Sequence, residues 1–397
     1  MSTIIDSLTN KRILIFGYGR EGKSTENFIK THVKYRSLDV FEGDKKDINE
    51  SEYDLIIKSP GIVMLEDNPK YTSQTELFLN EYSAQTIGVT GTKGKSTTSS
   101  MLAHTLNECG KKAVLLGNIG KPCFDMIDEI TADTTVVFEL SCHQLLHIDK
   151  APHIAVFLNL FEEHLDYYGT LDKYFGAKAN IISHQNVYDI AYIGENVPDI
   201  LSDSEKHVIC KAEHDFNMLI PGEHNRLNAE FALRIAVDEF GCDVQDVMEA
   251  IGSFKGLPHR LELFETINGI RFYDDSISTI PEAAISAVKS IDNVGVLILG
   301  GMDRGIDYNI LVDFIKEADD VSFVLAYATG ERIYSQVSDC SNVFKVEDLK
   351  EAVKKSFELA KDGEAIVLSP AAPSYGYFKN FEDRGQQFKE MVRGIVG

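Results

Sequence analysis

Basic residues are scarce in this sequence. It has 39 lysines and arginines against 62 aspartates and glutamates, which gives a formal net charge of −23. Such a chain would repel a phosphate backbone, so we expect no nucleic-acid partner. A local nest of backbone N–H groups can still bind a small anion on an acidic protein. The composition therefore argues against DNA and RNA and leaves anionic small molecules open.

Cysteines are few, and none are arranged as a motif. The six lie at positions 109, 123, 142, 210, 242 and 340, and no two form a C-x-x-C pair. This spacing predicts neither a zinc site nor a dithiol redox motif. Scattered, unpaired cysteines are typical of the reducing cytosol, so we expect a cytoplasmic protein.

A long hydrophobic run is also missing. No apolar stretch approaches the ~20 residues that a membrane-spanning helix needs. Residues 1–12 are polar and lack the apolar segment that is typical of signal peptides. We therefore expect neither a signal peptide nor an association with membranes.

The chain does contain a repeated order of apolar run, glycine turn and helix-like stretch. The runs lie at 12–19, 86–94, 134–141, 154–160, 294–301 and 364–370. Short apolar runs that alternate with helices are typical of buried parallel strands in α/β proteins. A chain of 397 residues suggests roughly two to four domains.

We predict an α/β protein of three domains. Residues 1–84 would form a Rossmann-like N-terminal domain, and residues 85–257 a central parallel sheet with a phosphate loop (P-loop). Residues 258–397 would form a Rossmann-like C-terminal domain.

The most informative motif is the segment TGTKGKST at 90–97, between an apolar strand and a predicted helix. A glycine-rich turn at a helix N-terminus directs several backbone N–H groups to one point, and the helix dipole adds positive potential. Lys95 would reach the β- and γ-phosphates, and Ser96 would bind Mg²⁺. The full Walker pattern has glycine where this chain has Val89, so the match is to GxxGK[ST]. A helix start that is merely rich in Gly, Lys and Thr explains the order of these residues less well.

Three further side chains could complete a metal site. Glu139 ends the apolar strand 134–138, and His164 and Asp166 follow the strand 154–160. The carboxyl ends of strands are where α/β sheets present ligands. Carboxylates suit Mg²⁺, and an imidazole could bind a second ion or orient a substrate. Glu139 alone could equally be an idle carboxylate, but the nearby phosphate loop favours a metal site.

Taken in order, the motifs resemble those of the Mur ligase family over nearly the whole chain. The segment at 90–97 resembles the family's ATP loop. Segments similar to other family motifs are GNIG (117–120), ELSCHQL (139–145), NLFEEHLDYYG (159–169), GEHNRLN (222–228), GLPHRLE (256–262) and LSPAAPSYGYFKNFEDRG (368–385). Their common order and spacing are more specific than any single motif.

The resemblance implies that residues 1–84 bind a UDP-linked substrate, residues 85–257 bind ATP and residues 258–397 bind an amino acid. It also implies which residues make these contacts and hold the metal. The implied ATP contacts are Gly91, Thr92, Lys93, Gly94, Lys95, Ser96, Thr97, Asn225, Arg260 and Asp275. The implied catalytic residues are Lys95, Glu139, His164 and Lys178. One Mg²⁺ would bind to Ser96 and Glu139, and a second to His164 and a carbamylated Lys178. The implied contacts of the UDP-linked substrate are Gly17, Tyr18, Gly19, Ser59, Gly61, Asn118, Ser141 and Gln144.

The resemblance also implies an activity. Such a protein would be a monomeric ATP-dependent ligase that adds glutamate, with D-glutamate favoured, to UDP-N-acetylmuramoyl-L-alanine through an acyl phosphate. Its amino-acid contacts would be Thr279, Arg304, Ser374 and Phe381. Among the departures from the family pattern, Ile277 and Arg304 stand where the family has lysines. L-glutamate or another amino acid therefore stays open.

A second glycine-rich turn, Gly17–Gly22, allows a rival interpretation. It follows the strand 12–16, and Asp39 lies where a ribose-binding acid would belong, which together suggest a dinucleotide site. A dehydrogenase-like protein is the alternative enzyme, and a nucleotide-gated binding protein without ligation is the non-enzymatic one. A plain strand–helix turn is a third possibility. We favour UDP at this turn because a ligase of this kind needs two nucleotides.

Overall fold

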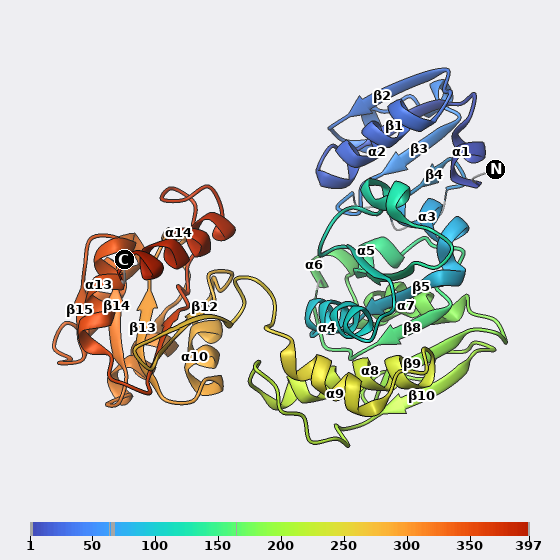
Figure 1. Cartoon of the computed structure of the whole chain (residues 1–397). Coiled ribbons are helices and arrows are strands. Elements are labelled where there is room, and N and C mark those ends of the chain that lie inside the picture. Colours follow the sequence, from blue (N-terminus) through green and yellow to red (C-terminus); the bar gives the residue numbers. More distant parts are fainter. Residues whose placement is uncertain (1–2, 63, 65–67, 164, 396–397) are drawn as a thin grey trace. The chain divides into compact units, whose positions relative to one another are not determined.

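The computed structural model describes residues 3–62, 64, 68–163 and 165–395. It divides into two compact units, one of Met1–Asn217 with His224–Gly252 and one of Met218–Glu223 with Ser253–Gly397. Three sheets, of four, six and six strands, follow one another along the described chain (Figure 1). The first unit holds the first two sheets and the second unit holds the third.

The first sheet is parallel throughout, in the order β2-β1-β3-β4. Its strands are β1 (Arg12–Phe16), β2 (Ser37–Phe41), β3 (Leu55–Lys58) and β4 (Tyr71–Thr72). The helices of this segment are α1 (Thr3–Leu8), α2 (Arg20–His32) and α3 (Gln74–Tyr82), with short 3₁₀ turns η1 (Lys45–Asp47), η2 (Glu50–Glu52) and η3 (Ser83–Gln85). After Arg12, β1 is a continuous and buried apolar run, as expected of a parallel strand that is covered on both faces.

The second sheet is also parallel, in the order β10-β9-β8-β5-β7-β6. Its strands are β5 (Thr86–Thr90), β6 (Ala113–Gly117), β7 (Thr135–Glu139), β8 (Ile154–Phe157), β9 (Ile190–Gly194) and β10 (Glu205–Ile209). The helices are α4 (Lys95–Glu108), α5 (Cys142–Leu145), α6 (Leu165–Tyr168), α7 (Leu171–Ser183), α8 (Glu223–Asp238) and α9 (Val244–Ser253), with η4 (Cys123–Glu129). Because β5 pairs with both β7 and β8, the carboxyl ends of these three buried strands lie side by side.

The third sheet has the order β11-β12-β16-β13-β14-β15. Only β11 (Glu262–Ile267) runs antiparallel, to β12 (Ile270–Asp274), among its described strands. The others are β13 (Val294–Leu299), β14 (Ser322–Leu325), β15 (Val343–Lys345) and β16 (Ala365–Leu368). The helices are α10 (Pro281–Ser290), α11 (Asn309–Glu317), α12 (Tyr327–Val337), α13 (Leu349–Leu359) and α14 (Phe381–Gly394).

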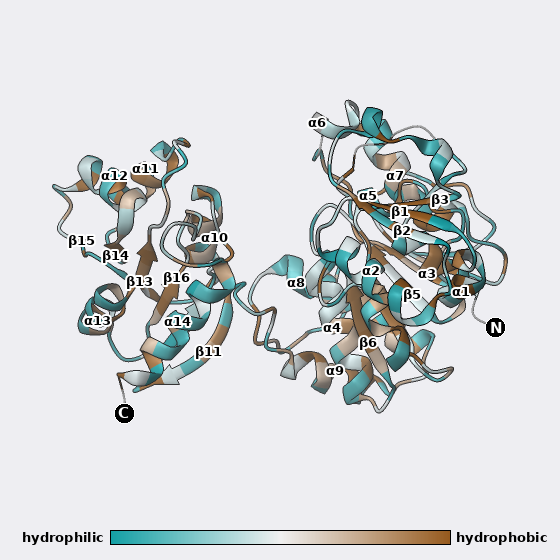
Figure 2. Cartoon of the chain, turned by 90° about the horizontal axis from the view of Figure 1, so that it is seen from above, coloured by the Kyte–Doolittle hydropathy of each residue, from teal (hydrophilic) through white to brown (hydrophobic). Residues whose placement is uncertain are grey.

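Helices cover both faces of this third sheet. One apolar cluster joins Leu297 of β13 to Leu311 of α11, and another joins Ile298 to Phe388 of α14. Strands β13 and β16 are accordingly coloured as hydrophobic in Figure 2. The predicted α/β class with parallel sheets is therefore confirmed. The apolar runs predicted it because strands that are buried on both faces need continuous apolar residues.

The proposed division into 1–84, 85–257 and 258–397 stays a prediction. One sheet falls within each of these segments, whereas the chain's contacts group the first two sheets into one unit. A shared apolar core contributes to that grouping, since Phe28 of α2 lies 4.5 Å from Phe124 of η4, measured between ring centroids. None of the described helices has the length and apolar character needed to cross a bilayer.

Gly300 shows how closely the loops at the carboxyl edge of the third sheet pack. Its φ is +126°, and an added Cβ would lie 1.9 Å from the carbonyl oxygen of Ala326. Its own N–H donates to the carbonyl of Pro370 over 2.9 Å. A side chain here meets both a backbone conformation that only glycine adopts easily and a rigid backbone atom.

We predict that Gly300→Ala lowers the free energy of unfolding by about 3 kcal/mol, because strain and overlap add. Gly305→Ala is the matched control: its φ is +72°, but open space surrounds the position of its Cβ. The control should cost only about 1 kcal/mol, the usual cost of a left-handed conformation. Urea unfolding followed by circular dichroism measures both, and equal losses would contradict the packing argument.

Candidate active site

The segment at 90–97 forms a tight turn between β5 and α4. Gly91 has a φ of +155° and Gly94 a φ of +85°. An added Cβ on Gly94 would lie 2.7 Å from the side-chain oxygen of Asn228, so a larger residue has no room there. None of the described side chains caps the N-terminus of α4, which begins at Lys95. The turn therefore leads directly into a helix N-terminus that favours negative charge.

Asn159, just after β8, forms hydrogen bonds with this turn. Its side-chain oxygen accepts from the N–H of Lys93 (2.8 Å), and its amide group donates to the carbonyl of Lys93 (3.0 Å). Its main-chain carbonyl accepts from the N–H of Thr92 over 2.9 Å. The motifs in the sequence assign no role to Asn159, although it is the first residue of the segment NLFEEHLDYYG. These contacts form because β8 and β5 are neighbouring strands, and the position of Asn159 in the chain does not reveal that pairing.

Two lysines meet beneath the turn. The ammonium groups of Lys95 and Lys178 each donate to the carbonyl oxygen of Gly91, both over 2.9 Å. Lys95 also donates to the carbonyl of Thr92 over 3.0 Å. Lys178 lies on α7 with only 1% of its surface exposed. The structure thus brings together two of the four predicted catalytic residues.

Burial, together with the neighbouring charge of Lys95, lowers the pKa of Lys178 to about 7. Burial also lowers the pKa of Lys95, while the carboxylate of Glu139 opposes that shift. Among the described residues, no carboxylate forms an ion pair with Lys178. Its amine is therefore far easier to deprotonate than an ordinary lysine.

Glu139 ends β7 beside the phosphate loop and is fully buried. One carboxylate oxygen, Oε1, accepts from the side-chain amide of Asn118 over 2.8 Å. The other, Oε2, is buried without a hydrogen-bond partner among the described residues. A buried carboxylate oxygen without a partner costs free energy, so this one fits a cation ligand. His164 lies outside the described residues, as do the contacts of the Asp166 side chain.

The predicted UDP-substrate residues fall in two groups. At the carboxyl edge of the first sheet, the Ser59 hydroxyl donates to the carbonyl of Gly17 over 2.8 Å. An added Cβ on Gly17 would lie 2.9 Å from the Cβ of Ser59. Tyr18 donates through its hydroxyl to Glu26 (2.5 Å), Gly19 precedes α2, and Gly61 lies on the exposed turn after Ser59.

The second group lies at the carboxyl edge of the second sheet, with Asn118 after β6 and Ser141 and Gln144 after β7. Ser141 and Gln144 form a capping box at the start of α5. The Gln144 amide donates to Oε1 of Glu21 over 2.8 Å, which joins this group to the glycine-rich turn Gly17–Gly22, the GYGREG turn. Burial raises the pKa of Glu21 to about 7. The motifs assign no role to Glu21, and only its place within that turn could have suggested one.

Four predicted amino-acid contacts gather in the second unit, on loops that follow β12, β13 and β16. Arg304 donates to the carbonyl of Thr279 over 3.2 Å. Ser374 is buried, and Phe381 begins α14. Because β16 lies between β12 and β13, these loops leave the same edge of the sheet. The structure therefore brings the four residues to one edge.

The remaining predicted ATP contacts divide between the units. Asn225 lies on α8, where its side chain accepts from Asn228 over 3.2 Å. Asp275 in the second unit accepts from Ser369 (2.7 Å), and burial raises its pKa to about 6. Arg260 is exposed in the segment before β11. The predicted ATP contacts therefore lie in both units of the chain.

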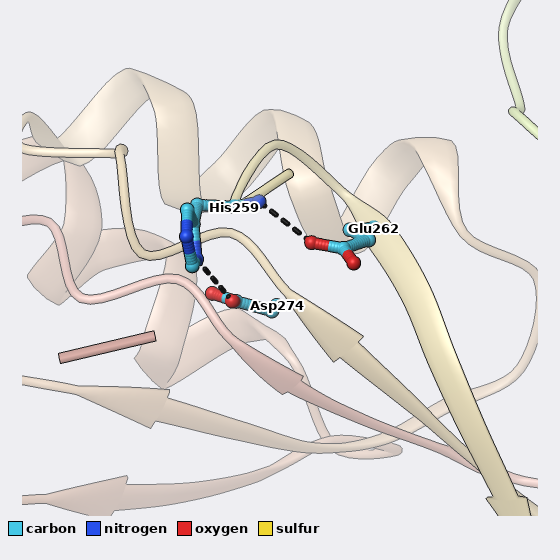
Figure 3. Close-up of side chains that lie close together, drawn as sticks. All are labelled: His259, Glu262 and Asp274. Carbon is cyan, nitrogen blue, oxygen red and sulfur yellow. Dashed lines mark hydrogen bonds and ion pairs between the residues drawn. The ribbon is translucent and has the colours of Figure 1, made fainter. Parts of the chain in front are cut away.

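His259, Glu262 and Asp274 lie close together in the second unit (Figure 3). His259 pairs with Asp274 through Nδ1 over 2.6 Å, and its main-chain N–H donates to Glu262 over 2.8 Å. Their ligand atoms lie within 4.8 Å of one another, as in a metal site. The Lys389 ammonium, however, lies 2.5 Å from Glu262 and 3.4 Å from Asp274. This lysine supplies the positive charge that two acids need, so the cluster is an ion-pair network.

Known proteins share both the sequence and the fold. Residues 89–211 match the Mur ligase middle domain, and residues 259–372 match the Mur ligase, glutamate ligase domain. A UDP-N-acetylmuramoylalanine–D-glutamate ligase of Ruminiclostridium cellulolyticum is 32% identical, over 86% of this chain and 83% of that protein. The Clostridioides difficile protein of the same name is 29% identical, over 98% of this chain and 99% of its own length.

Among solved structures, the UDP-N-acetylmuramate–alanine ligase of Thermotoga maritima has a TM-score of 0.61 at 19% identity and covers 97% of this chain and 100% of its own. The MurF ligase of the same organism, solved in complex with ADP, has a TM-score of 0.57 at 17% identity and covers 98% and 96%. Identities this low show the fold alone. The resemblance inferred from the motifs is confirmed by the family matches and by the first of the curated relatives: the chain belongs to the Mur ligase family.

Proposed function

We propose that the protein joins D-glutamate to UDP-N-acetylmuramoyl-L-alanine with hydrolysis of ATP, in cytoplasmic synthesis of peptidoglycan precursors. The observation that carries this proposal is the phosphate loop after β5 with the buried, unpartnered oxygen of Glu139 beside it at the end of β7. The names of the curated relatives support the choice of substrates. The GYGREG turn then binds the diphosphate of UDP, and no dinucleotide is needed.

ATP would bind at the turn before α4. The N–H groups of the first helical turn face the phosphates, and Lys95 would exchange its bonds to the carbonyls of Gly91 and Thr92 for phosphate oxygens. Asn225 would contact the adenine, and the family resemblance adds Arg260 and Asp275 as ATP contacts. A solved structure of the same fold was determined in complex with ADP, which is consistent with an adenine nucleotide as ligand.

Ser96 and Glu139 would hold one Mg²⁺, and the unpartnered Oε2 of Glu139 supports that assignment. The ion would neutralise charge on the phosphate oxygens as they transfer. His164 and a carbamate on Lys178 would hold a second ion. The hydroxyl of Ser96 follows Lys95 directly, in the order typical of phosphate loops.

The chemistry follows from the inertness of a carboxylate. A carboxylate is a poor electrophile, so its oxygen first takes the γ-phosphoryl group from ATP, which leaves as ADP. The amine of glutamate then attacks the carbonyl carbon, the bond from that carbon to the phosphate oxygen breaks, and the amine loses a proton. Lys95 would stabilise the charge on the transferring group, and positioning supplies most of the remaining acceleration.

The two groups of predicted substrate residues would divide the UDP-linked substrate between them. Gly17, Tyr18, Gly19, Ser59 and Gly61 lie at the edge of the first sheet and would bind the UDP. Asn118, Ser141 and Gln144 would bind the sugar-linked end. The bond from Gln144 to Glu21 ties the two groups together within one unit. This arrangement supports one extended substrate across both sheets.

Arg304, Thr279, Ser374 and Phe381 would bind the amino acid. Arg304 offers two parallel donors for one carboxylate, in contrast to the single ammonium of the family's lysine. Ile277, which also replaces a lysine, turns its N–H to the carbonyl of His259 over 3.1 Å. These two substitutions bear on the carboxylates of the amino acid, so both enantiomers belong in the test.

We predict that phosphate release from ATP requires both UDP-N-acetylmuramoyl-L-alanine and D-glutamate, measured over a panel of amino acids with both enantiomers.

Lys95→Ala should abolish turnover, because the charge on the transferring phosphoryl group then lacks its cation, and should leave binding of the UDP-linked substrate nearly intact. Lys112→Ala is the control, since that lysine is exposed beyond the end of α4.

Four results would contradict the proposal in different ways. Faster turnover with L-glutamate would overturn the enantiomer, and phosphate release without any amino acid would overturn the ligation. Tight binding of NADH, seen in its fluorescence, would favour the dehydrogenase-like alternative. Equal loss of turnover and of UDP-substrate binding in Lys95→Ala would mean that the turn has only a structural role.

We also propose that Lys178 carries a carbamate. The neutral amine attacks the carbon of CO₂ and releases a proton, which gives an anionic −NH–COO⁻ group. The burial of Lys178 and its lack of a carboxylate partner among the described residues support this, because the product replaces a buried cation by an anion beside Lys95. A pKa of about 7 leaves much of the amine neutral near physiological pH.

With ¹³C-labelled bicarbonate at pH 7.5, the protein should show a carbamate resonance that Lys178→Met lacks. Lys173→Met, an exposed position on the same helix, should keep the resonance. Carbon-13 NMR measures it. A spectrum without the signal at saturating bicarbonate, or a signal that survives in Lys178→Met, would refute the modification.

A further inference from the structure

Arg384, in the first turn of α14, is a buried cation at the centre of the amino-acid site. We propose that it is a positioning residue that holds the three loops of this site in one arrangement. Only 1% of its surface is exposed, and its guanidinium donates to groups on all three loops. The inference rests on the proposed function, because it concerns where glutamate would bind.

The contacts of Arg384 run to each loop in turn. On the loop after β12, it donates to the carbonyl of Ser276 (2.8 Å) and to its hydroxyl (3.0 Å). On the loop after β16, it donates to the carbonyl of Ala372 over 3.0 Å. On the loop after β13, it makes a longer contact of 3.5 Å with the carbonyl of Gly300. One side chain thus joins segments that leave three neighbouring strands.

The loops pack tightly beside the guanidinium at Gly301. An added Cβ on Gly301 would lie 2.4 Å from the carbonyl oxygen of Pro373 and 3.0 Å from Nη1 of Arg384. The N–H of Met302 donates to the same Pro373 carbonyl over 2.9 Å. The loops after β13 and β16 therefore touch each other directly around the arginine.

Arginine suits this place better than lysine. Its planar group presents five N–H donors that diverge, whereas the three donors of lysine leave a single nitrogen. The partners are carbonyl and hydroxyl oxygens, and no described carboxylate forms an ion pair with Arg384. Asp274 and Asp275 are close enough to favour its charge. The cost of burying the charge is thus offset by several fixed dipoles.

The four predicted amino-acid contacts depend on these loops. Thr279 follows Ser276, Arg304 follows Gly300, and Ser374 follows Ala372 by a few residues each. The Ser276 hydroxyl donates to the carbonyl of Phe381 over 2.8 Å, so the fourth contact belongs to the same network. Each of the three guanidinium nitrogens of Arg384 already donates to the protein. It would therefore act on glutamate through the loops and would not touch it.

The test compares Arg384→Lys with Arg393→Lys, an exposed arginine on the same helix that pairs with Glu265 over 3.3 Å. We expect Arg384→Lys to raise KM for glutamate about tenfold or more and to change KM for ATP much less, because the lost contacts position the amino-acid loops. Hydrogen–deuterium exchange of the whole chain should quicken at 275–280, 300–305 and 371–377, with β13 and β16 unchanged. Arg393→Lys should alter neither measurement.

Ser276→Ala serves as the milder variant, because it removes one acceptor of Arg384 and keeps the charge buried. It should shift KM for glutamate and exchange in the same three segments, in the same direction and by less. Unchanged exchange in these segments in both variants would overturn the inference, as would an equal rise of both KM values. A wild-type protein without glutamate-dependent turnover would refute the proposed function alone, since the exchange arm tests the three loops independently of any activity.

Discussion

The central site is organised around one backbone carbonyl that accepts from two ammonium groups. Lys95 and Lys178 both donate to Gly91, and both are drawn out of water. Two cations at one dipole are poorly compensated, so this place favours an anion. The φ of +155° at Gly91 leaves its carbonyl where both amines reach it. An incoming phosphate, and a carbamate on Lys178, would each supply the charge that is missing.

Glu139 is the counterpart of those cations. It is fully buried, one of its oxygens has no partner among the described residues, and its charge favours the protonated form of Lys95. Neither the acid nor the lysines are satisfied by protein groups alone. A site with unmet charge of both signs at the ends of neighbouring strands is suited to a metal-bound polyphosphate.

In the second unit, the buried charges are compensated by groups of the protein itself. Its loops at the carboxyl edge of the third sheet are held from within by Arg384 and by the tight approach of Gly300 and Gly301 to neighbouring backbone. Lys389 compensates Glu262 and Asp274 in the same unit. Here the charges are already paired or surrounded by dipoles. The loops are thus held by the protein's own groups, and Arg304 lies exposed beside them, where it would be able to bind a carboxylate.

Local signals in the sequence determined the strands, the phosphate loop and the family, because apolar runs and glycine turns act over a few neighbouring residues. Glu139 and Lys178 could be named from motifs, but their shared environment could not be seen. Contacts such as Gln144 with Glu21, 123 positions apart, and Arg384 with Ser276, 108 positions apart, exist only once the strands have paired. The same holds for the pKa of Lys178, which depends on burial beneath a loop 87 residues away. Tertiary structure decided these features because they depend on which strand ends become neighbours, and short-range patterns do not carry that information.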